Sequence, residues 1–148
     1  LDDGRLCVAS TCLGVCEVLI ELMVDHATTR RTFGLPLADR QHIRFAIADS
    51  EVELQLGRAL VRQTVAARER GEPLGAAASI CKLHCTEAAG RIADRAVQIF
   101  GGAGVVRGVQ VEQLYRDVRF FRIGEGASEI QRMLIARSRL GRPTRAGD

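Results

Sequence analysis

The stretch that decides the fold is 6-LCVASTCLGVCEVLIELMVDHA-27, near the start of a chain of 148 residues. Apolar side chains recur along it at alternating steps of three and four residues, at Leu6, Ala9, Leu13, Cys16, Ile20, Met23 and Ala27. This spacing places them on one face of an α-helix, because an α-helix has about 3.6 residues per turn. The sequence therefore predicts one long amphipathic helix that ends near Gly34-Leu35-Pro36.

Two further long helices are predicted after it. The second runs from Leu37 to about Arg70, with a stripe formed by Ile43, Ile47, Ser50, Leu54, Gly57, Val61 and Val65. A break at 68-RERGEPLG-75 precedes the third, from about Pro73 to Phe100, with a stripe formed by Ile80, His84, Ala88, Ile92, Ala96 and Ile99. Because His84 lies on this apolar stripe, we interpret it as a buried, hydrogen-bonded core residue rather than a ligand.

The rest of the chain completes a bundle. We expect the glycine-rich stretch 101-GGAGVVRG-108 to be non-helical, 111–121 to be a short amphipathic segment, and about 127–140 to be the last helix. Residues 142–148 are predicted to be a disordered tail, and no strand pattern is found. Long helices with apolar stripes and short breaks predict an all-α, up-down four-helix bundle over residues 1–141.

Composition argues against several classes of protein. The formal net charge is +3, tryptophan is absent and tyrosine occurs once, which argues against a nucleic-acid partner. No stretch approaches the roughly 20 uncharged apolar residues of a membrane span, and the start of the chain lacks the features of a signal peptide. We therefore expect a soluble, cytoplasmic protein with no membrane span.

The five cysteines allow two interpretations. Cys12 with Cys16, and Cys81 with Cys85 beside His84, have the i, i+4 spacing that places two metal ligands on one helical face. Their apolar neighbours, however, are typical of thiols that pack as small hydrophobic residues. We favour free thiols in a reducing compartment and expect no metal site.

Three loop stretches carry unusual groups, and each alone has an ordinary explanation. Residues 30-RRTFGLPLADRQ-41 combine cations, a hydroxyl and an aromatic ring, which suits a phosphate and a planar ring but also describes a helix end terminated by Gly34. Residues 98-QIFGGAG-104 offer backbone amides for close approach by a ligand, or only a turn. Glu125, within 115-YRDVRFFRIGEGASEIQR-132, is a lone acid before a helix, where acids commonly complement the helix dipole.

In this order and spacing the three stretches resemble the C-terminal domain of the acyl-CoA dehydrogenases, from 1-LDDGR-5 to about Gly141. The resemblance implies the last third of a longer subunit, whose N-terminal helical domain and middle β domain are absent from this chain. It also implies FAD-dependent α,β-dehydrogenation of an acyl-CoA thioester by a homo-oligomer, a dimer or a dimer of dimers. An electron-transfer flavoprotein is the implied electron acceptor, and the chain alone is expected to be inactive.

The resemblance assigns the catalytic role to Glu125. This residue matches the family's base, which removes the α-proton of the thioester while the β-hydride passes to N5 of FAD. Its own N–H is expected to donate to the thioester carbonyl, and Gly124 and Gly126 to leave room for the substrate. A few family members carry the base on the first helix, at the position of Gly4, where glycine cannot serve.

Further contacts follow from the same resemblance. Asp2 and Arg5 match contacts near the CoA moiety, although ordinary first-turn charges explain them equally well. The implied cofactor contacts are Arg30, Thr32, Phe33, Gln41, Gln98, Gly101, Gly102, Ala127 and Glu129. The first seven are expected to reach the FAD of a neighbouring subunit. Ala127 stands where the family commonly has threonine, so one hydroxyl contact to FAD is expected to be lost.

Two other functions remain open from the sequence. A flavin-dependent oxidase of the same superfamily would share the bundle, although nitroalkane oxidases typically place aspartate at the base position, so Glu125 favours a thioester substrate. A structural or oligomerisation bundle would keep the fold without chemistry. The sequence leaves undecided the length and branching of the acyl group.

Overall fold

A computed structural model describes residues 2–141, and the tail predicted for 142–148 lies outside this range. Five α-helices account for most of the described chain. In chain order the elements are α1 (Asp2–Thr29), β1 (Arg31–Thr32), β2 (Leu35–Pro36), η1 (Leu37–Asp39), α2 (Gln41–Glu69), α3 (Ala77–Phe100), η2 (Gly101–Val105), α4 (Gln110–Phe121) and α5 (Ser128–Leu140), where η denotes a 3₁₀-helix.

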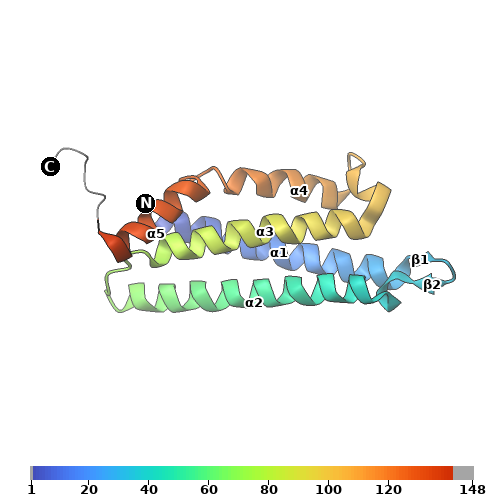
Figure 1. Cartoon of the computed structure of the whole chain (residues 1–148), viewed down its shortest axis with the longest axis horizontal. Coiled ribbons are helices and arrows are strands. Elements are labelled where there is room, and N and C mark those ends of the chain that lie inside the picture. The colour runs from blue at the N-terminus through green and yellow to red at the C-terminus, as the bar shows by residue number, and fades with distance from the viewer. Residues whose placement is uncertain (1, 142–148) are drawn as a thin grey trace.

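The helices alternate in direction along one axis (Figure 1). α1 and α3 run one way, while α2 and the pair α4 and α5 run the other way; the pair occupies the fourth position of the bundle. α3 is central, since it packs against α1 most extensively and also against α2, α4 and α5. The predicted up-down four-helix bundle is confirmed, with a break in the fourth position at 122–127.

The core follows the predicted stripe of α1 closely. Six of its seven residues are buried, and only Leu13 is half-buried, while Cys12 and Leu19 are also fully buried. The buried stripe is wider than predicted because α1 packs against both α3 and α2. On α2 and α3 two predicted stripe residues, Val65 and Ile80, are instead exposed.

α1 is the one helix within 2–141 that is long and apolar enough to cross a membrane by length and composition alone. The expectation that no stretch approaches a span was therefore too strict for this segment. Its buried side chains form part of the bundle core against α3 and α2. This packing gives an ordinary reason for an apolar helix, because the core helix of a bundle has the same composition as a short span.

The connection from α1 to α2 differs from the prediction. α1 ends at Thr29 rather than at 34–36, and the chain then forms a two-residue antiparallel hairpin in which Arg31 pairs with Pro36 and Thr32 with Leu35. Phe33 and Gly34 form its turn with φ values of 51° and 81°. Positive φ at both central residues is the requirement of a type I′ turn. The expectation of no strand was wrong here, because this turn lacks the usual Asn-Gly or Gly-Gly pair.

Other boundaries shift by one helical turn. α2 begins at Gln41 because residues 37–39 form a 3₁₀ turn, and α3 begins at Ala77 rather than at Pro73. The glycine-rich stretch 101–108 was expected to be non-helical, but its first residues form a 3₁₀-helix, Gly101–Val105. These differences leave the order and direction of the helices unchanged.

The cysteines behave as core residues. Cys12, Cys16, Cys81 and Cys85 are buried, whereas Cys7 is exposed. Burial raises the pKa of the Cys12 and Cys16 thiols to about 12. His84 is half-buried, and its Nε2 lies 3.2 Å from the Glu53 carbonyl oxygen. The prediction of a hydrogen-bonded histidine is confirmed, although its burial is only partial.

Candidate active site

The residues singled out from the sequence lie at opposite ends of the bundle (Figure 1). At the end where α1 and α5 begin lie Asp2, Arg5, Glu125, Gly126, Ala127 and Glu129. At the end where α1 finishes and α2 begins lie Arg30, Thr32, Phe33, Gln41, Gln98, Gly101 and Gly102. α1 has 28 residues, so the two groups are about 40 Å apart at a rise of about 1.5 Å per residue. The structure therefore forms two clusters, which we call the carboxylate cluster and the hairpin cluster.

Glu125 stands in an unusual backbone conformation within the loop 122–127. Its φ is 54°, and among residues 2–141 only Phe33 is also a non-glycine residue with positive φ. Gly126 follows with φ of 94°. A left-handed conformation costs an ordinary residue about 1–2 kcal/mol, so it persists only where surrounding contacts impose it. Both strained residues are among those predicted to bind substrate or cofactor.

Two buried side chains hold this part of the loop. Lys82 on α3 donates from Nζ to the Gly126 carbonyl oxygen at 2.8 Å. Gln131 on α5 donates from Nε2 to the carbonyl oxygens of Glu125 at 3.2 Å and of Gly126 at 3.0 Å. Both side chains have no exposed surface. Sequence reasoning missed them, although a lysine within the apolar run of the third helix was a visible signal.

The Glu125 side chain is exposed and reaches toward the first turn of α1. A Cβ built at Gly4 would lie only 2.6 Å from Glu125 Oε2 and 3.0 Å from its Cδ. Glycine at position 4 therefore leaves the space that the carboxylate occupies. The two positions at which the family resemblance places a base are thus neighbours in this fold.

The glycines beside Glu125 have structural neighbours of their own. A Cβ at Gly124 would lie 2.9 Å from the Phe120 ring, and one at Gly126 would lie 2.7 Å from Gln131 Nε2. Packing within the chain thus gives a reason for both glycines, in addition to the room for substrate inferred from the resemblance.

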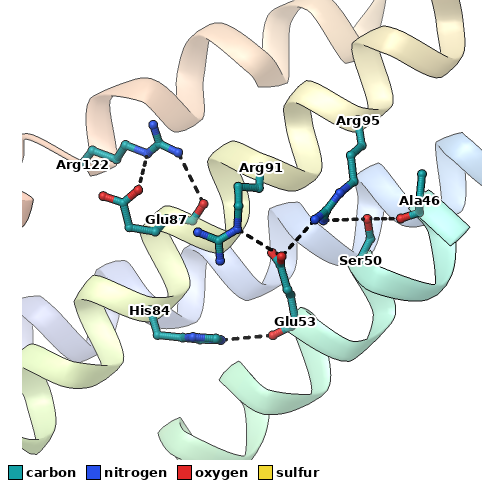
Figure 2. Close-up of polar contacts among 8 residues, drawn as sticks. All are labelled: Ala46, Ser50, Glu53, His84, Glu87, Arg91, Arg95 and Arg122. Atoms are coloured by element: carbon teal, nitrogen blue, oxygen red, sulfur yellow. Dashed lines mark hydrogen bonds and ion pairs between the residues drawn. The ribbon is translucent and has the colours of Figure 1, made fainter.

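Glu87 on α3 ties the loop 122–127 to the bundle, and Figure 2 shows its contact with Arg122 at the start of this loop. Its carboxylate accepts a hydrogen bond of 2.7 Å from Ser128 Oγ, lies 3.4 Å from Arg122 Nε and lies 3.8 Å from Arg132 Nη2. Arg122 crosses α3 at Gly90, where a Cβ would have no room. Partial burial raises the Glu87 pKa, but the Ser128 hydrogen bond and the arginine charges outweigh it and lower the pKa overall.

Asp2 and Arg5 form an ion pair of 2.8 Å in the first turn of α1, and both are half-buried. Arg5 Nε is buried and has no hydrogen-bond partner within the described part of the chain. The pair lies at the same end of the bundle as Glu125, with Asp2 two residues before Gly4 and Arg5 directly after it. The short distance between Asp2 and Arg5 is that of a local ion pair. The same position would also place both side chains near a ligand bound at the carboxylate cluster.

The hairpin cluster presents groups suited to a flat, anionic ligand. The Phe33 side chain is 97% exposed, and the Arg40 guanidinium lies 5.8 Å from its ring centroid. Arg30, Gln41 and Gln98 are exposed. A free ring, nearby cations and unobstructed backbone amides fit the aromatic and phosphate parts of a dinucleotide.

The ends of α1 and α3 are joined at this cluster. The rings of His26 and Phe100 stack with their centroids 4.1 Å apart. Burial lowers the pKa of His26, and the Arg30 charge acts in the same direction. Gly101 and Gly102 follow directly and have open space around their Cβ positions. Two stretches about 70 residues apart in sequence, 26–33 and 98–102, thus form one surface.

The fold and the two clusters define an up-down helical bundle whose chemical groups lie in the loops at its ends. Residues 1–140 match the family model of the acyl-CoA dehydrogenase C-terminal domain. The chain belongs to the acyl-CoA dehydrogenase family. The resemblance inferred from the motifs is therefore confirmed.

Individual relatives support the assignment over nearly the whole chain. The (R)-benzylsuccinyl-CoA dehydrogenase of Thauera aromatica is 43% identical over 137 residues, which are 92% of this chain and 34% of that protein. The butyryl-CoA dehydrogenase structure from Megasphaera elsdenii has a TM-score of 0.88 at 34% identity, over 91% of this chain and 35% of that one. A glutaryl-coenzyme A dehydrogenase in complex with glutaryl-CoA has a TM-score of 0.90 at 29% identity, over 95% of this chain and 36% of that one. The chain spans about a third of the length of the curated relatives it matches.

Proposed function

We propose that this chain is the C-terminal bundle of a longer acyl-CoA dehydrogenase subunit, which we call the complete subunit. The proposed reaction is the FAD-dependent α,β-dehydrogenation of an acyl-CoA thioester, with Glu125 as the base that removes the α-proton. Family membership supports the reaction class. The observation that carries the assignment of the base is the exposed Glu125 carboxylate, set on a left-handed residue and directed over Gly4.

The reaction requires more than a carboxylate, because an α-proton beside a thioester is far less acidic than a carboxylic acid. Negative charge that develops on the thioester oxygen must be stabilised by donors already in place. The Glu125 N–H is the proposed donor in this chain. The contacts from Lys82 and Gln131 to the neighbouring carbonyls support this role, since they keep the loop from reorganising during the reaction.

FAD, when bound, accepts the β-hydride. We assign Ala127 and Glu129 to the flavin nearest Glu125, and the hairpin cluster to the flavin of a neighbouring subunit. The separation of about 40 Å along α1 supports this division, because it exceeds the reach of one dinucleotide. The exposed Phe33 ring and the open backbone at Gly101 and Gly102 support the fit to the cofactor.

A shared flavin site requires a homo-oligomer, which we propose is a dimer or a dimer of dimers. The outer face of α2 supports this proposal, because Phe45, Val52 and Leu56 are each more than half exposed there. Their spacing of seven and four residues places them on one side of the helix. We further propose that electrons leave the reduced flavin to an electron-transfer flavoprotein.

The test is the substitution Glu125→Gln in the complete subunit, measured by turnover with an acyl-CoA thioester. The variant is expected to lose most activity while it retains flavin, because only the proton acceptor is removed. Glu69→Gln, at the exposed end of α2, is the matched control and should keep the wild-type rate. An unchanged rate for Glu125→Gln would overturn the assignment of the base. Rapid peroxide formation under air would favour an oxidase instead.

A further inference from the structure

A buried lysine lies beside the loop of the carboxylate cluster and takes no chemical step in the reaction described above. Lys82 is the largest side chain with no exposed surface among residues 2–141. It lies on α3, the central helix, and the hydrogen bond that its ammonium makes is the one to Gly126 O at 2.8 Å. Taking an ammonium out of water is unfavourable unless it is paired or hydrogen-bonded. The position therefore calls for a specific explanation.

Stability alone explains Lys82 poorly. An unbranched apolar side chain of similar length fills the same space without burying a charge, and such replacements of buried ionic groups are often neutral or stabilising. Burial lowers the pKa of Lys82, which shows that the charged form is disfavoured at this position.

The contact that Lys82 makes falls on the peptide that follows Glu125. Glu125 and Gly126 both have positive φ, and their carbonyl oxygens accept hydrogen bonds from Lys82 and Gln131 inside the bundle. The Glu125 side chain, in contrast, is exposed. Holding both carbonyls inward leaves the carboxylate facing outward, toward Gly4. A loop without these donors is free to relax to ordinary negative φ, which redirects the Glu125 side chain.

We propose that Lys82 is a positioning residue for the base. Its buried ammonium holds the left-handed Glu125–Gly126 backbone through the hydrogen bond to the Gly126 carbonyl oxygen. This inference rests on the proposed role of Glu125. It assigns to Lys82 no contact with substrate or flavin. Gln131 is the second member of the same support, donating to the same carbonyl from the opposite helix, α5.

The experiment compares rate and binding in the complete subunit, loaded with flavin. Lys82→Met removes the charge and the donor but keeps a long, unbranched side chain. The rate of anaerobic flavin reduction by an acyl-CoA thioester should fall about 10- to 100-fold, since a misplacement of about 1 Å costs that much. The dissociation constant of the thioester and the thermal midpoint should stay near wild type. Thr86→Val is the control, because Thr86 is equally buried on α3 and its hydrogen bond goes only to Leu83 O.

Glu125→Gln is measured alongside, so that the two ideas fail separately. A wild-type rate in Glu125→Gln overturns the proposed function and this inference with it. Loss of flavin reduction in Glu125→Gln together with a wild-type rate in Lys82→Met overturns only the positioning role. Lys82→Gln is a second variant in case the Met variant does not fold. If both Lys82 variants fail to fold, or lose rate and stability in parallel, Lys82 is a structural residue and the inference is overturned.

Discussion

Gly4 offers the sharpest perturbation of the carboxylate cluster, because the three atoms nearest to a new methyl group there all belong to the Glu125 carboxyl group. In Gly4→Ala the new Cβ would lie 2.6 Å from Glu125 Oε2, whereas ordinary van der Waals contact begins near 3.4 Å. The carboxylate must therefore move by about 0.8 Å, the difference between these two distances. The Glu125 side chain is exposed and flexible at its end, so this movement costs the fold little.

The same substitution favours the helix, which separates its effect on stability from its effect on rate. Alanine is better than glycine within a helix by up to about 1 kcal/mol. We therefore expect the thermal midpoint of Gly4→Ala to be unchanged or higher. The rate of flavin reduction by an acyl-CoA thioester should fall by about 10- to 100-fold, the effect of a base displaced by nearly 1 Å.

Gly14→Ala is the matched control for this experiment. Gly14 lies on the same helix, and a Cβ built there has no neighbour within 4 Å. This variant should gain stability from helix propensity and keep the wild-type rate. If Gly4→Ala also keeps the wild-type rate in the stopped-flow assay, the exposed carboxylate over Gly4 is not the base and the reasoning fails.

Three further predictions concern the loop and the thiols. The Glu87 pKa is lowered from its ordinary value near 4.5, so the stability that Glu87 contributes is complete above about pH 4.5 and is lost as the pH falls through its folded pKa. The variant Glu87→Gln should remove this part of the acid dependence of the thermal midpoint, and a pH profile identical to that of the wild type would contradict the prediction. The variant Gly126→Ala places a Cβ 2.7 Å from Gln131 Nε2, at a residue whose φ is 94°. Its free energy of unfolding, measured with urea, should fall by about 1–2 kcal/mol, and an unchanged free energy would contradict the prediction. Iodoacetamide at mildly alkaline pH should modify the exposed Cys7 first, while the buried Cys12, Cys16, Cys81 and Cys85 stay protected until the protein unfolds. Mass spectrometry of the peptides measures the order of labelling, and early labelling of Cys12 would contradict its burial in the core.

The helical bundle could be predicted from the sequence because the spacing of apolar residues along each helix is a local pattern. The steps of three and four residues along α1 predict a buried stripe, and six of the seven predicted residues are buried. The hairpin after Thr29 was missed because its turn places Phe33, which has a Cβ, at positive φ. Such a conformation is imposed by contacts such as the Arg40 hydrogen bond to Thr32 O, which no sequence period records.

The site was only partly visible in the sequence. Glu125 alone looked like an ordinary acid before a helix, and the motifs around it suggested a role only by their likeness to a family. Lys82 and Gln131 could not be assigned from spacing, because they lie 43 residues before and 6 residues after Glu125 and meet at its loop only in the folded bundle. The proximity of Gly4 and Glu125 likewise arises only in the folded chain.

The most direct test of the central claim is anaerobic bleaching of the flavin in the complete subunit by acyl-CoA thioesters of increasing chain length. The account predicts that at least one thioester bleaches the wild-type flavin, and that Glu125→Gln binds flavin and the same thioester without bleaching. The thioester that bleaches fastest would also define the substrate class. A flavin-loaded wild-type protein that no thioester bleaches, or a Glu125→Gln variant that bleaches at the wild-type rate, would contradict it.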